Sequence, residues 1–338
     1  MRRPLASPVA LRSERAFEEG RKVTWLELFF DLVFVAAVAQ AATHLRDDYS
    51  PAGLCRFALL FVLIWWAWLG HTTFSTRFDT DDVVQRGLTT LQMFLVAVMA
   101  INATGALGSR DSAGFAAAYS LMRFVLAGQF LRARRVGGAR RLATRYALSC
   151  ATAAALWLSS AFLDAPERFV VWALALAIDV GTPLVTTPHL VEVPHDAAHL
   201  PERYGLFSII LMGESMAAVM AGMAHQEYWS VRAAAAAIGG IAAIFAIWWT
   251  YFDGVDAAAH RRVQSMADAT RFHLWSYAHL PLYLGMAVLG VGLERVIETA
   301  TEAPPPSSEA LILGAAAGAV ALSLAAIGGA RPRRTPAI

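Results

Sequence analysis

Two acidic residues interrupt an apolar stretch near the start of the chain. The stretch VTWLELFFDLVFVAAVAQAATHL spans residues 23–45 and carries Glu27 and Asp31. Their i, i+4 spacing places both carboxylates on one face of a helix. A charged group at the centre of a membrane helix costs about 2.5–3.5 kcal/mol on insertion scales, so it normally faces protein or water. The pattern predicts a polar stripe that serves either an ion pair or an ion path.

Glu27 also has a simpler explanation. The residues Thr24-Trp25-Leu26-Glu27 have the form of a capping box at the start of an apolar helix. In that role the Glu27 carboxylate bonds back to the Thr24 amide at the membrane interface, and we expect it to be hardly buried. Asp31 lies about 10 Å farther into the helix than Thr24, where capping does not account for it.

A second helix repeats this arrangement of acids. Glu202 follows Pro201 in the first turn, where the helix dipole favours an acid. Glu214 follows about 18 Å farther along the helix axis, after an apolar run. Each of the two helices therefore has one acid at its mouth and one inside the membrane.

Three further residues could complete a buried charge network. Arg123, Asp179 and His279 each fall inside an apolar segment. They supply a fixed positive charge, another carboxylate and an imidazole that titrates near neutral pH. Two uses remain open. Arg123 could form a structural ion pair with Asp31 or Glu214, or these groups could line a path for a cation, a proton or a small charged solute.

The composition is that of a polytopic membrane protein. Hydrophobic residues make up 57% of the 338-residue chain and charged residues only 16%, whereas soluble domains contain roughly 45–50% and about 25%. A helix needs about 20 apolar residues to cross the hydrocarbon core. By this criterion we predict an all-α fold with ten transmembrane helices, at residues 24–45, 52–73, 87–107, 112–132, 143–163, 167–186, 202–224, 231–252, 271–293 and 308–329.

Arginine placement predicts the orientation. The segment RARRVGGARRLATR, residues 132–145, holds six arginines, and HRRV at 260–263 and RPRR at 331–334 lie on the same side of a ten-span protein. Basic loops stay in the cytoplasm, so we expect both termini there and the chain in an inner (plasma) membrane. The loop from Arg132 to Arg145 is expected to contact anionic lipid rather than nucleic acid.

The chain also shows signs of an internal repeat. FVLIWWAWLGH at 61–71 resembles IFAIWWTYFDG at 244–254, and the offset of 183 residues is the same as that between Asp31 and Glu214. Corresponding helices of the two copies are six spans apart. Because six is even, both copies would share one orientation, as in parallel-repeat transporters. Chance recurrence of aromatic pairs is the alternative. The predicted divisions are a cytoplasmic tail at 1–23, a first helical repeat at 24–132, a basic loop with a two-helix insertion at 133–186, a loop with a second repeat at 187–329, and a basic tail at 330–338.

Motifs for other chemistry are weak. His189, His195 and His199 lie in one loop, but without an HExxH context a solvated loop is favoured over a metal site. Ser215 has no G-x-S-x-G frame, and no glycine-rich phosphate loop occurs. We therefore expect no enzyme activity, no cofactor and no metal.

Three segments resemble the signatures of a known family. LELFFDLVFV at 26–35, HLPERYGLFSIILMGES at 199–215 and WWTYFD at 248–253 are similar to those of the bacterial low temperature requirement A (LtrA) family, and the resemblance covers about residues 20–330. It implies a polytopic membrane protein and carries the motif acids over onto Glu27, Asp31, Glu202 and Glu214. It adds little chemistry, because the family's biochemical activity is poorly defined. Phe29-Phe30-Asp31 is also loosely similar to a motif of lysosomal-type potassium channels.

Two function classes follow from the sequence. The first is a transporter or channel for a small solute or ion, with Asp31 and Glu214 as titratable site residues and Arg123 as a counter-ion or substrate clamp. The second is a non-transporting membrane scaffold or stress-related sensor, in which the same charges lock helix packing.

Overall fold

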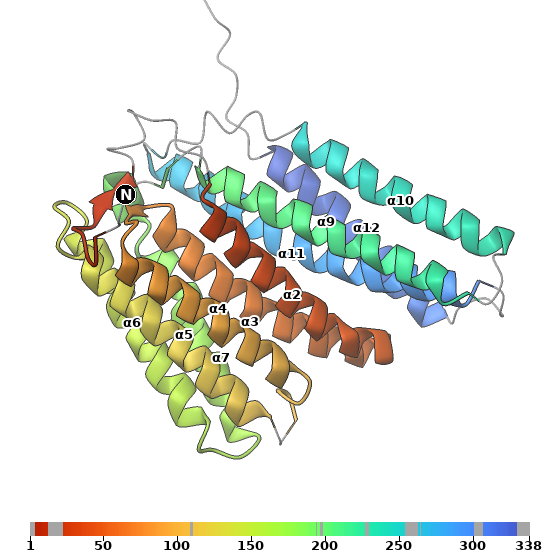
Figure 1. The fold of residues 1–338 in the computed structure, drawn as a ribbon, viewed down its shortest axis with the longest axis horizontal. Helices are drawn as coiled ribbons and strands as arrows, with labels where there is room; N and C mark the ends of the chain where they lie inside the picture. Colours follow the sequence, from red (N-terminus) through yellow and green to blue (C-terminus); the bar gives the residue numbers. More distant parts are fainter. Residues whose placement is uncertain are drawn as a thin grey trace, which may run out of the picture. The chain divides into compact units, whose positions relative to one another are not determined.

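A computed structural model describes residues 4–12, 23–108, 111–193, 195–196, 199–226, 230–253, 263, 265–300 and 307–329 (Figure 1). Helices dominate this part of the chain. They are α2 (Trp25–Asp47), α3 (Pro51–Ser75), α4 (Val83–Ala103), α5 (Ser112–Ala133), α6 (Arg140–Ser160), α7 (Glu167–Val185), the short α8 (Pro188–Glu192), α9 (His199–Ala224), α10 (Val231–Phe252), α11 (Met266–Glu298) and α12 (Ser307–Gly329). Two short strands, β1 (Ala10–Leu11) and β2 (Phe78–Asp79), accompany them.

The ten long helices of the described residues correspond one to one with the ten predicted spans, so the all-α, polytopic fold is confirmed. Nine of them are long and apolar enough to cross a membrane. The exception is α6, which carries Arg140, Arg141 and Arg145 in its first two turns and is rich in small residues. The predicted duplication remains a prediction.

Helix α4 begins four residues before the predicted start. Asp82 caps it, because its Oδ1 accepts a hydrogen bond from the Gln85 amide at 2.6 Å. The first turn after this cap contains Gln85 and Arg86, and hydropathy therefore places the start of the span too late. Side-chain capping, rather than apolar character, determines where this helix begins.

Contacts divide the chain into two units that interleave along the sequence. The first unit contains residues 1–37, 63–203 and 262–269, and the second contains residues 38–62, 204–261 and 270–338. Helices α2, α3, α9 and α11 each contribute residues to both units.

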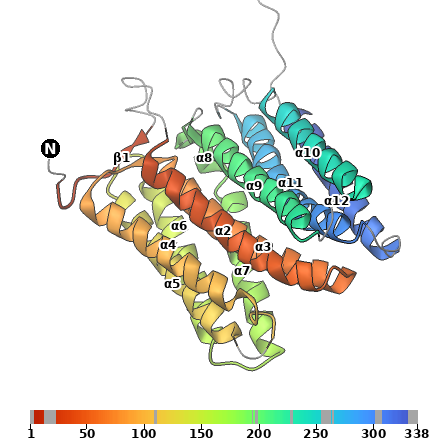
Figure 2. The same cartoon turned by 45° about the vertical axis from the view of Figure 1, so that its right-hand side comes forward.

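In the first unit, helices α4 to α7 pack against one another in chain order (Figure 2). Aromatic rings fill one end of this bundle: the ring centroids of Tyr119 and Trp157 lie 4.3 Å apart, and those of Trp157 and Trp172 lie 4.7 Å apart. A second core cluster contains Phe74, Phe130 and neighbouring apolar residues. These contacts hold α3, α5 and α7 close enough for their polar side chains to meet.

In the second unit, α10 packs against α12. A hydrogen-bonded aromatic cluster joins α9 to α11: the Tyr204 hydroxyl lies 2.6 Å from Ser276 Oγ, and the Tyr283 hydroxyl donates to the Tyr204 carbonyl at 2.8 Å. The two tryptophan pairs of the predicted repeat differ in burial. Trp65 and Trp66 are buried, whereas Trp248 and Trp249 are 41% and 55% exposed.

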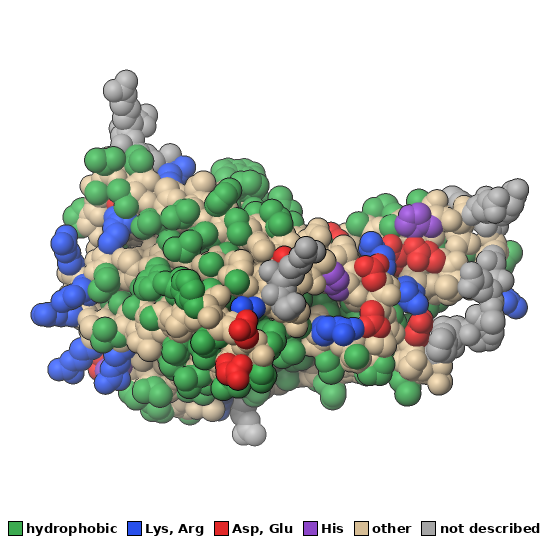
Figure 3. Space-filling model, turned by 90° about the horizontal axis from the view of Figure 1, so that it is seen from below, with side chains coloured by type: hydrophobic (Ala, Val, Ile, Leu, Met, Phe, Trp, Pro, Cys, Tyr) green, Lys and Arg blue, Asp and Glu red, His purple; other side chains and the backbone are tan. Residues whose placement is uncertain are grey.

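Exposed hydrophobic side chains cover much of the face drawn in Figure 3. Phe94, Leu148 and Val170 are among the large apolar residues that face outward from the long helices. In a membrane these side chains contact lipid, so their exposure carries no penalty. In the arginine-rich loop, Arg134, Arg135, Arg140, Arg141 and Arg145 are exposed, and the lipid contact predicted for them remains a prediction.

The N-terminal segment packs against the α3–α4 connection, which the sequence did not indicate. β1 pairs with β2 in antiparallel register, Ala10 opposite Asp79 and Leu11 opposite Phe78. Ser7 donates its amide to Asp82 Oδ2 at 2.8 Å, and Arg132 donates to the same oxygen at 2.6 Å. Asp82 therefore caps α4, anchors the N-terminal segment and binds one of the six loop arginines.

We predict that protonation of Asp82 releases residues 4–12. Burial raises the pKa of Asp82, but the Ser7 and Gln85 amides and the Arg132 guanidinium hold it below its ordinary value. A depressed pKa means that the anchor is complete above the unfolded value of about 3.9 and is lost as the pH falls through the folded value. Asp82→Asn should therefore increase amide hydrogen exchange in residues 4–12 already at pH 7.

The matched control is Asp81→Asn, because the neighbouring Asp81 is bonded to Arg86 on the more exposed side of the connection. Equal exchange of residues 4–12 in both variants and in the wild type would contradict the assignment of Asp82 as their anchor.

Candidate functional site

The capping box at the start of α2 is confirmed. Glu27 Oε2 accepts a hydrogen bond from the Thr24 amide at 2.9 Å, and Thr24 Oγ1 accepts one from the Glu27 amide at 3.3 Å. The expectation that Glu27 would be hardly buried is wrong, however, because its side chain is buried. Segments distant in sequence cover the first turn of α2.

The second carboxylate oxygen of Glu27 gathers three cationic or polar groups. Its Oε1 lies 3.1 Å from His199 Nε2, 3.3 Å from Arg12 Nη2 and 3.6 Å from Arg203 Nη1. His199 and Arg203 come from the first residues of α9, and Arg12 comes from the N-terminal segment. Glu27 thus fastens the start of α2 to both segments.

Asp31 is paired with Arg203. Its Oδ1 accepts hydrogen bonds from Arg203 Nη2 at 2.5 Å and from Trp68 Nε1 at 2.7 Å, and its Oδ2 accepts one from Arg203 Nε at 3.0 Å. Both charged side chains are fully buried. Asp31 was one of two partners considered for an ion pair with Arg123, and the structure gives it Arg203 instead. Arg203 also donates to Ser75 Oγ at 3.3 Å and lies over the Phe30 ring.

This group of side chains is balanced in charge. The carboxylates of Glu27 and Asp31 face the guanidinium groups of Arg12 and Arg203, and the imidazole of His199 is the fifth member. Sequence reasoning missed Arg203, because an arginine in the first turn of a span normally extends to the interface. The position of Arg203 could have indicated the pairing. A buried acid requires a cation, and Arg203 and Asp31 both lie near the N-terminal ends of their helices, α9 and α2.

A small cavity of about 50 Å³ borders this network. Its wall includes Arg12, Glu27, His71 and Ser75. A buried water needs about 10–15 Å³ of such space and two to four polar partners. The cavity can therefore hold a few water molecules beside the Glu27 carboxylate.

A second buried ion pair joins α5 to α7 near their middles. Arg123 Nη2 donates a hydrogen bond to Asp179 Oδ1, and both side chains are almost fully buried. The sequence marked each residue separately, and the structure brings the two together. Gly70 on α3 permits the approach, because a Cβ atom there would lie 2.7 Å from Arg123 Nη1.

This second pair leaves hydrogen-bonding capacity unused. Arg123 Nε and Nη1 and Asp179 Oδ2 are buried and have no hydrogen-bond partner in the described part of the chain. A cavity of about 20 Å³ lies beside them, and Ser149, Cys150 and Thr182 contribute to its wall. This volume is enough for one water molecule. The pair is thus a polar, incompletely bonded centre within apolar helices.

The remaining candidates lie apart from these groups. Glu202 is exposed and accepts a hydrogen bond from the Val23 amide at 3.3 Å. Glu214 is exposed on α9, unlike its predicted counterpart Asp31. His279 in the second unit is buried, with Nδ1 2.7 Å from the Trp275 carbonyl and Nε2 3.1 Å from the Tyr251 hydroxyl.

The three histidines of the predicted cytoplasmic loop do not form one cluster. His189 lies 3.1 Å from Glu192, His195 lies 3.0 Å from Thr76 Oγ1, and His199 contacts Glu27. Within the described residues these partners come from different segments.

Comparison with known proteins identifies the family. The family described as bacterial low temperature requirement A protein (LtrA) matches residues 22–337. The chain belongs to the LtrA family. An uncharacterized protein from Rhizobium meliloti (strain 1021) is 30% identical over 294 residues, which cover 83% of this chain and 71% of that protein. No solved structure matches the chain significantly.

The part of the chain that matches the LtrA family contains most of the buried charged residues described above. The matched range includes Glu27, Asp31 and Arg203 as well as the pair Arg123–Asp179. Together with the long apolar helices it establishes a multi-pass membrane protein. Neither the family description nor the name of the relative is that of an enzyme.

We predict that Asp31→Asn strongly destabilises the protein. The substitution leaves the guanidinium of Arg203 buried without its counter-charge, and breaking such a pair costs about 3–5 kcal/mol. The expected result is a clear fall in the thermal unfolding midpoint in detergent. The double variant Asp31→Asn with Arg203→Gln should recover part of the loss, because it removes the uncompensated charge.

The matched control is Asp48→Asn, which removes an acid from the exposed pair with Arg56. Exposed pairs contribute about 0–1 kcal/mol, so this variant should unfold near the wild-type temperature. Similar midpoints for Asp31→Asn and Asp48→Asn would show that the buried pair is not a structural lock.

Proposed function

We propose that this LtrA protein moves a small ion or small polar solute across the membrane, with Arg123 and Asp179 at the centre of the path. The observation that carries the proposal is the incompletely bonded, buried pair beside a small cavity whose mostly apolar wall includes Ser149 and Thr182. Ionisable residues inside a membrane are costly and commonly mark solute pathways or proton relays. The arginine distribution further supports an inner-membrane location with both termini in the cytoplasm.

The unused hydrogen-bonding atoms favour a working site over a simple packing contact. A buried polar atom without a partner costs about 1–3 kcal/mol. A structural ion pair avoids that cost by saturating its bonds, as Asp31 does with Arg203 and Trp68. Arg123 Nε and Nη1 and Asp179 Oδ2 instead remain available to a water, an ion or a polar group of a solute.

The proposal assigns different roles to the predicted site residues. Arg123 supplies a fixed positive charge, as the sequence suggested, and Asp179 supplies the carboxylate that can exchange a proton or a cation. Asp31, expected from the sequence to titrate, instead locks α2 to the start of α9 through Arg203. Glu214 has no role in this proposal.

A scaffold or sensor role is favoured by a different observation. Glu27, Asp31 and Arg203 join α2 to α9, and none of these three side chains keeps a buried polar atom without a partner in the described residues. A protein whose charges serve only packing would keep water away from the pairs Arg123–Asp179 and Asp31–Arg203. Access of water to these pairs therefore distinguishes a scaffold from a transporter.

We predict that Asp179→Asn lowers ion flux through proteoliposomes at least about tenfold, which corresponds to 1.4 kcal/mol in the barrier. The substitution removes the only carboxylate of the pair. Flux is measured as proton movement with an internal pH dye and as current under potassium, sodium and chloride gradients. Thr182→Val should also lower flux, because it removes a hydroxyl group from the wall of the cavity while leaving Arg123 and Asp179 paired.

The matched control is Asp164→Asn, which removes an exposed acid from the α6–α7 connection. Its flux should equal that of the wild type. Robust wild-type flux that survives both Asp179→Asn and Thr182→Val would overturn the assignment of the path.

A second prediction does not depend on knowing the solute. Cys150 is buried and lines the cavity beside Arg123 and Asp179. In a Cys55→Ser background, a small cationic methanethiosulfonate reagent should modify Cys150 at a measurable rate, because a transport path opens to water. Ala153→Cys, one turn along α6 and buried outside that cavity wall, should stay unreactive when Cys150 is replaced by serine.

The scaffold alternative gives the opposite result. If Cys150 and Ala153→Cys are equally inert in folded protein, water does not reach the pair and the transport proposal fails.

A further inference from the structure

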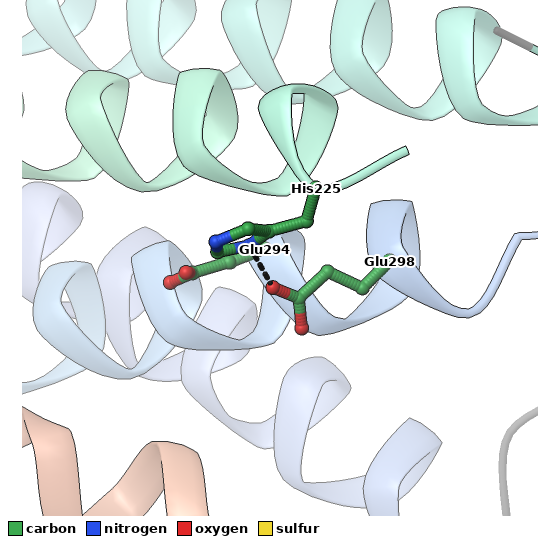
Figure 4. A group of neighbouring side chains, drawn as sticks. All are labelled: His225, Glu294 and Glu298. Atoms are coloured by element: carbon green, nitrogen blue, oxygen red, sulfur yellow. Dashed lines mark hydrogen bonds and ion pairs between the residues drawn. The ribbon is translucent and has the colours of Figure 1, made fainter. Parts of the chain in front are cut away.

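Three side chains capable of binding a metal meet at the C-terminal ends of α9 and α11, within the second unit (Figure 4). They are His225, which directly follows α9, and Glu294 and Glu298, which lie one turn apart on α11. One ligand atom from each lies within 4.8 Å of the other two. His225 and Glu298 are 73 residues apart in sequence, so no motif spacing indicated the group.

Close helix packing positions the group. A Cβ atom on Gly222 would lie 2.9 Å from the Glu294 carbonyl oxygen, so α9 and α11 approach backbone to backbone at this glycine. Gln226 then donates its side-chain amide to the carbonyls of Ile297 at 2.9 Å and Glu298 at 3.0 Å. These contacts hold the end of α9 over the last turn of α11 and direct His225 toward the two acids.

The three side chains differ in their exposure to solvent. The side chain of His225 is 64% exposed, that of Glu298 is 30% exposed and that of Glu294 is fully buried. Glu294 Oε1 has no hydrogen-bond partner in the described structure. An unbonded, buried carboxylate oxygen beside an imidazole and a second carboxylate has the chemistry of a cation ligand.

Arg46 orients the buried acid. Its Nη2 donates to Glu294 Oε2 at 2.6 Å, which leaves Oε1 as the free oxygen of that carboxylate. Arg46 is itself held, because its carbonyl accepts a hydrogen bond from Arg295 at 2.9 Å, and Arg295 pairs with Glu309 at 2.8 Å. Partners of this kind behind the direct ligands orient a metal site.

We propose that His225, Glu294 and Glu298 bind a divalent transition-metal cation. One imidazole nitrogen and two carboxylate oxygens suit Zn²⁺ and its first-row neighbours, and three protein ligands leave a coordination position for water. Two ligand atoms on one zinc ion can be at most about 4.4 Å apart, so a small side-chain rotation closes the present group around an ion. The cation takes the place of the 2.7 Å contact between His225 Nδ1 and Glu298, and the imidazole binds it in the neutral form, through a ring nitrogen that carries no proton.

The test uses the full chain in detergent or nanodiscs and Zn²⁺ itself as the probe, in competition with a chromophoric chelator. The wild type should bind one Zn²⁺ per chain and unfold at a higher temperature when it is bound. His225→Ala and Glu298→Gln should each weaken binding at least about tenfold, because loss of even an outer partner costs about 10–100-fold. Glu294→Gln removes the third ligand but leaves Arg46 unpaired. If that variant does not fold, Glu298→Gln still tests the proposal.

The matched control is His189→Ala. His189 and Glu192 form another histidine–glutamate contact, but among the described residues no third metal-binding side chain joins them. This variant should bind Zn²⁺ with wild-type affinity. The proposal is overturned if the wild type binds no zinc, or if His225→Ala and Glu298→Gln bind it as tightly as the wild type does. The readout is binding, so its failure is independent of the flux measurements.

Discussion

The cost of placing a charge among apolar helices determines which parts of this protein must meet. Asp31 enters the membrane-spanning part of α2, and its carboxylate has a bidentate contact with Arg203 at the start of α9. Neither side chain is exposed, so each is tolerated only because the other is present. The same constraint joins α5 to α7 through Arg123 and Asp179, and joins α2 to α11 through Arg46 and Glu294.

These pairs differ in how completely their bonds are made, and that difference is the basis of the roles proposed above. Asp31 has both oxygens bonded and a tryptophan as an additional donor. Arg123, Asp179 and Glu294 each keep buried atoms without a partner. In the proposals above, these unused bonding positions are available to a transported solute and to a bound cation.

How well the candidate site could be predicted from sequence varied from residue to residue. The cap formed by Thr24 and Glu27 is local and was read correctly, because four consecutive residues contain all its atoms. The burial of Glu27 was not, because Arg12 and His199 cover it from segments remote in the sequence. Arg123 was recognised as a buried cation, with Asp31 or Glu214 considered as its partner, and the structure pairs it with Asp179. Several acids lie at a similar depth, and sequence does not choose among them.

The sequence by itself determined the helices and their membrane character, because apolar length and capping residues act within a single segment. It also determined that charges would lie inside the membrane, because Asp31, Arg123 and Asp179 stand within apolar runs. Only the tertiary structure decided which charges pair, since that choice depends on which helix faces meet and how closely. Gly222 is one example, because its missing side chain lets α9 lie against the backbone of α11 at Glu294 and so brings His225 close to the acids of that helix.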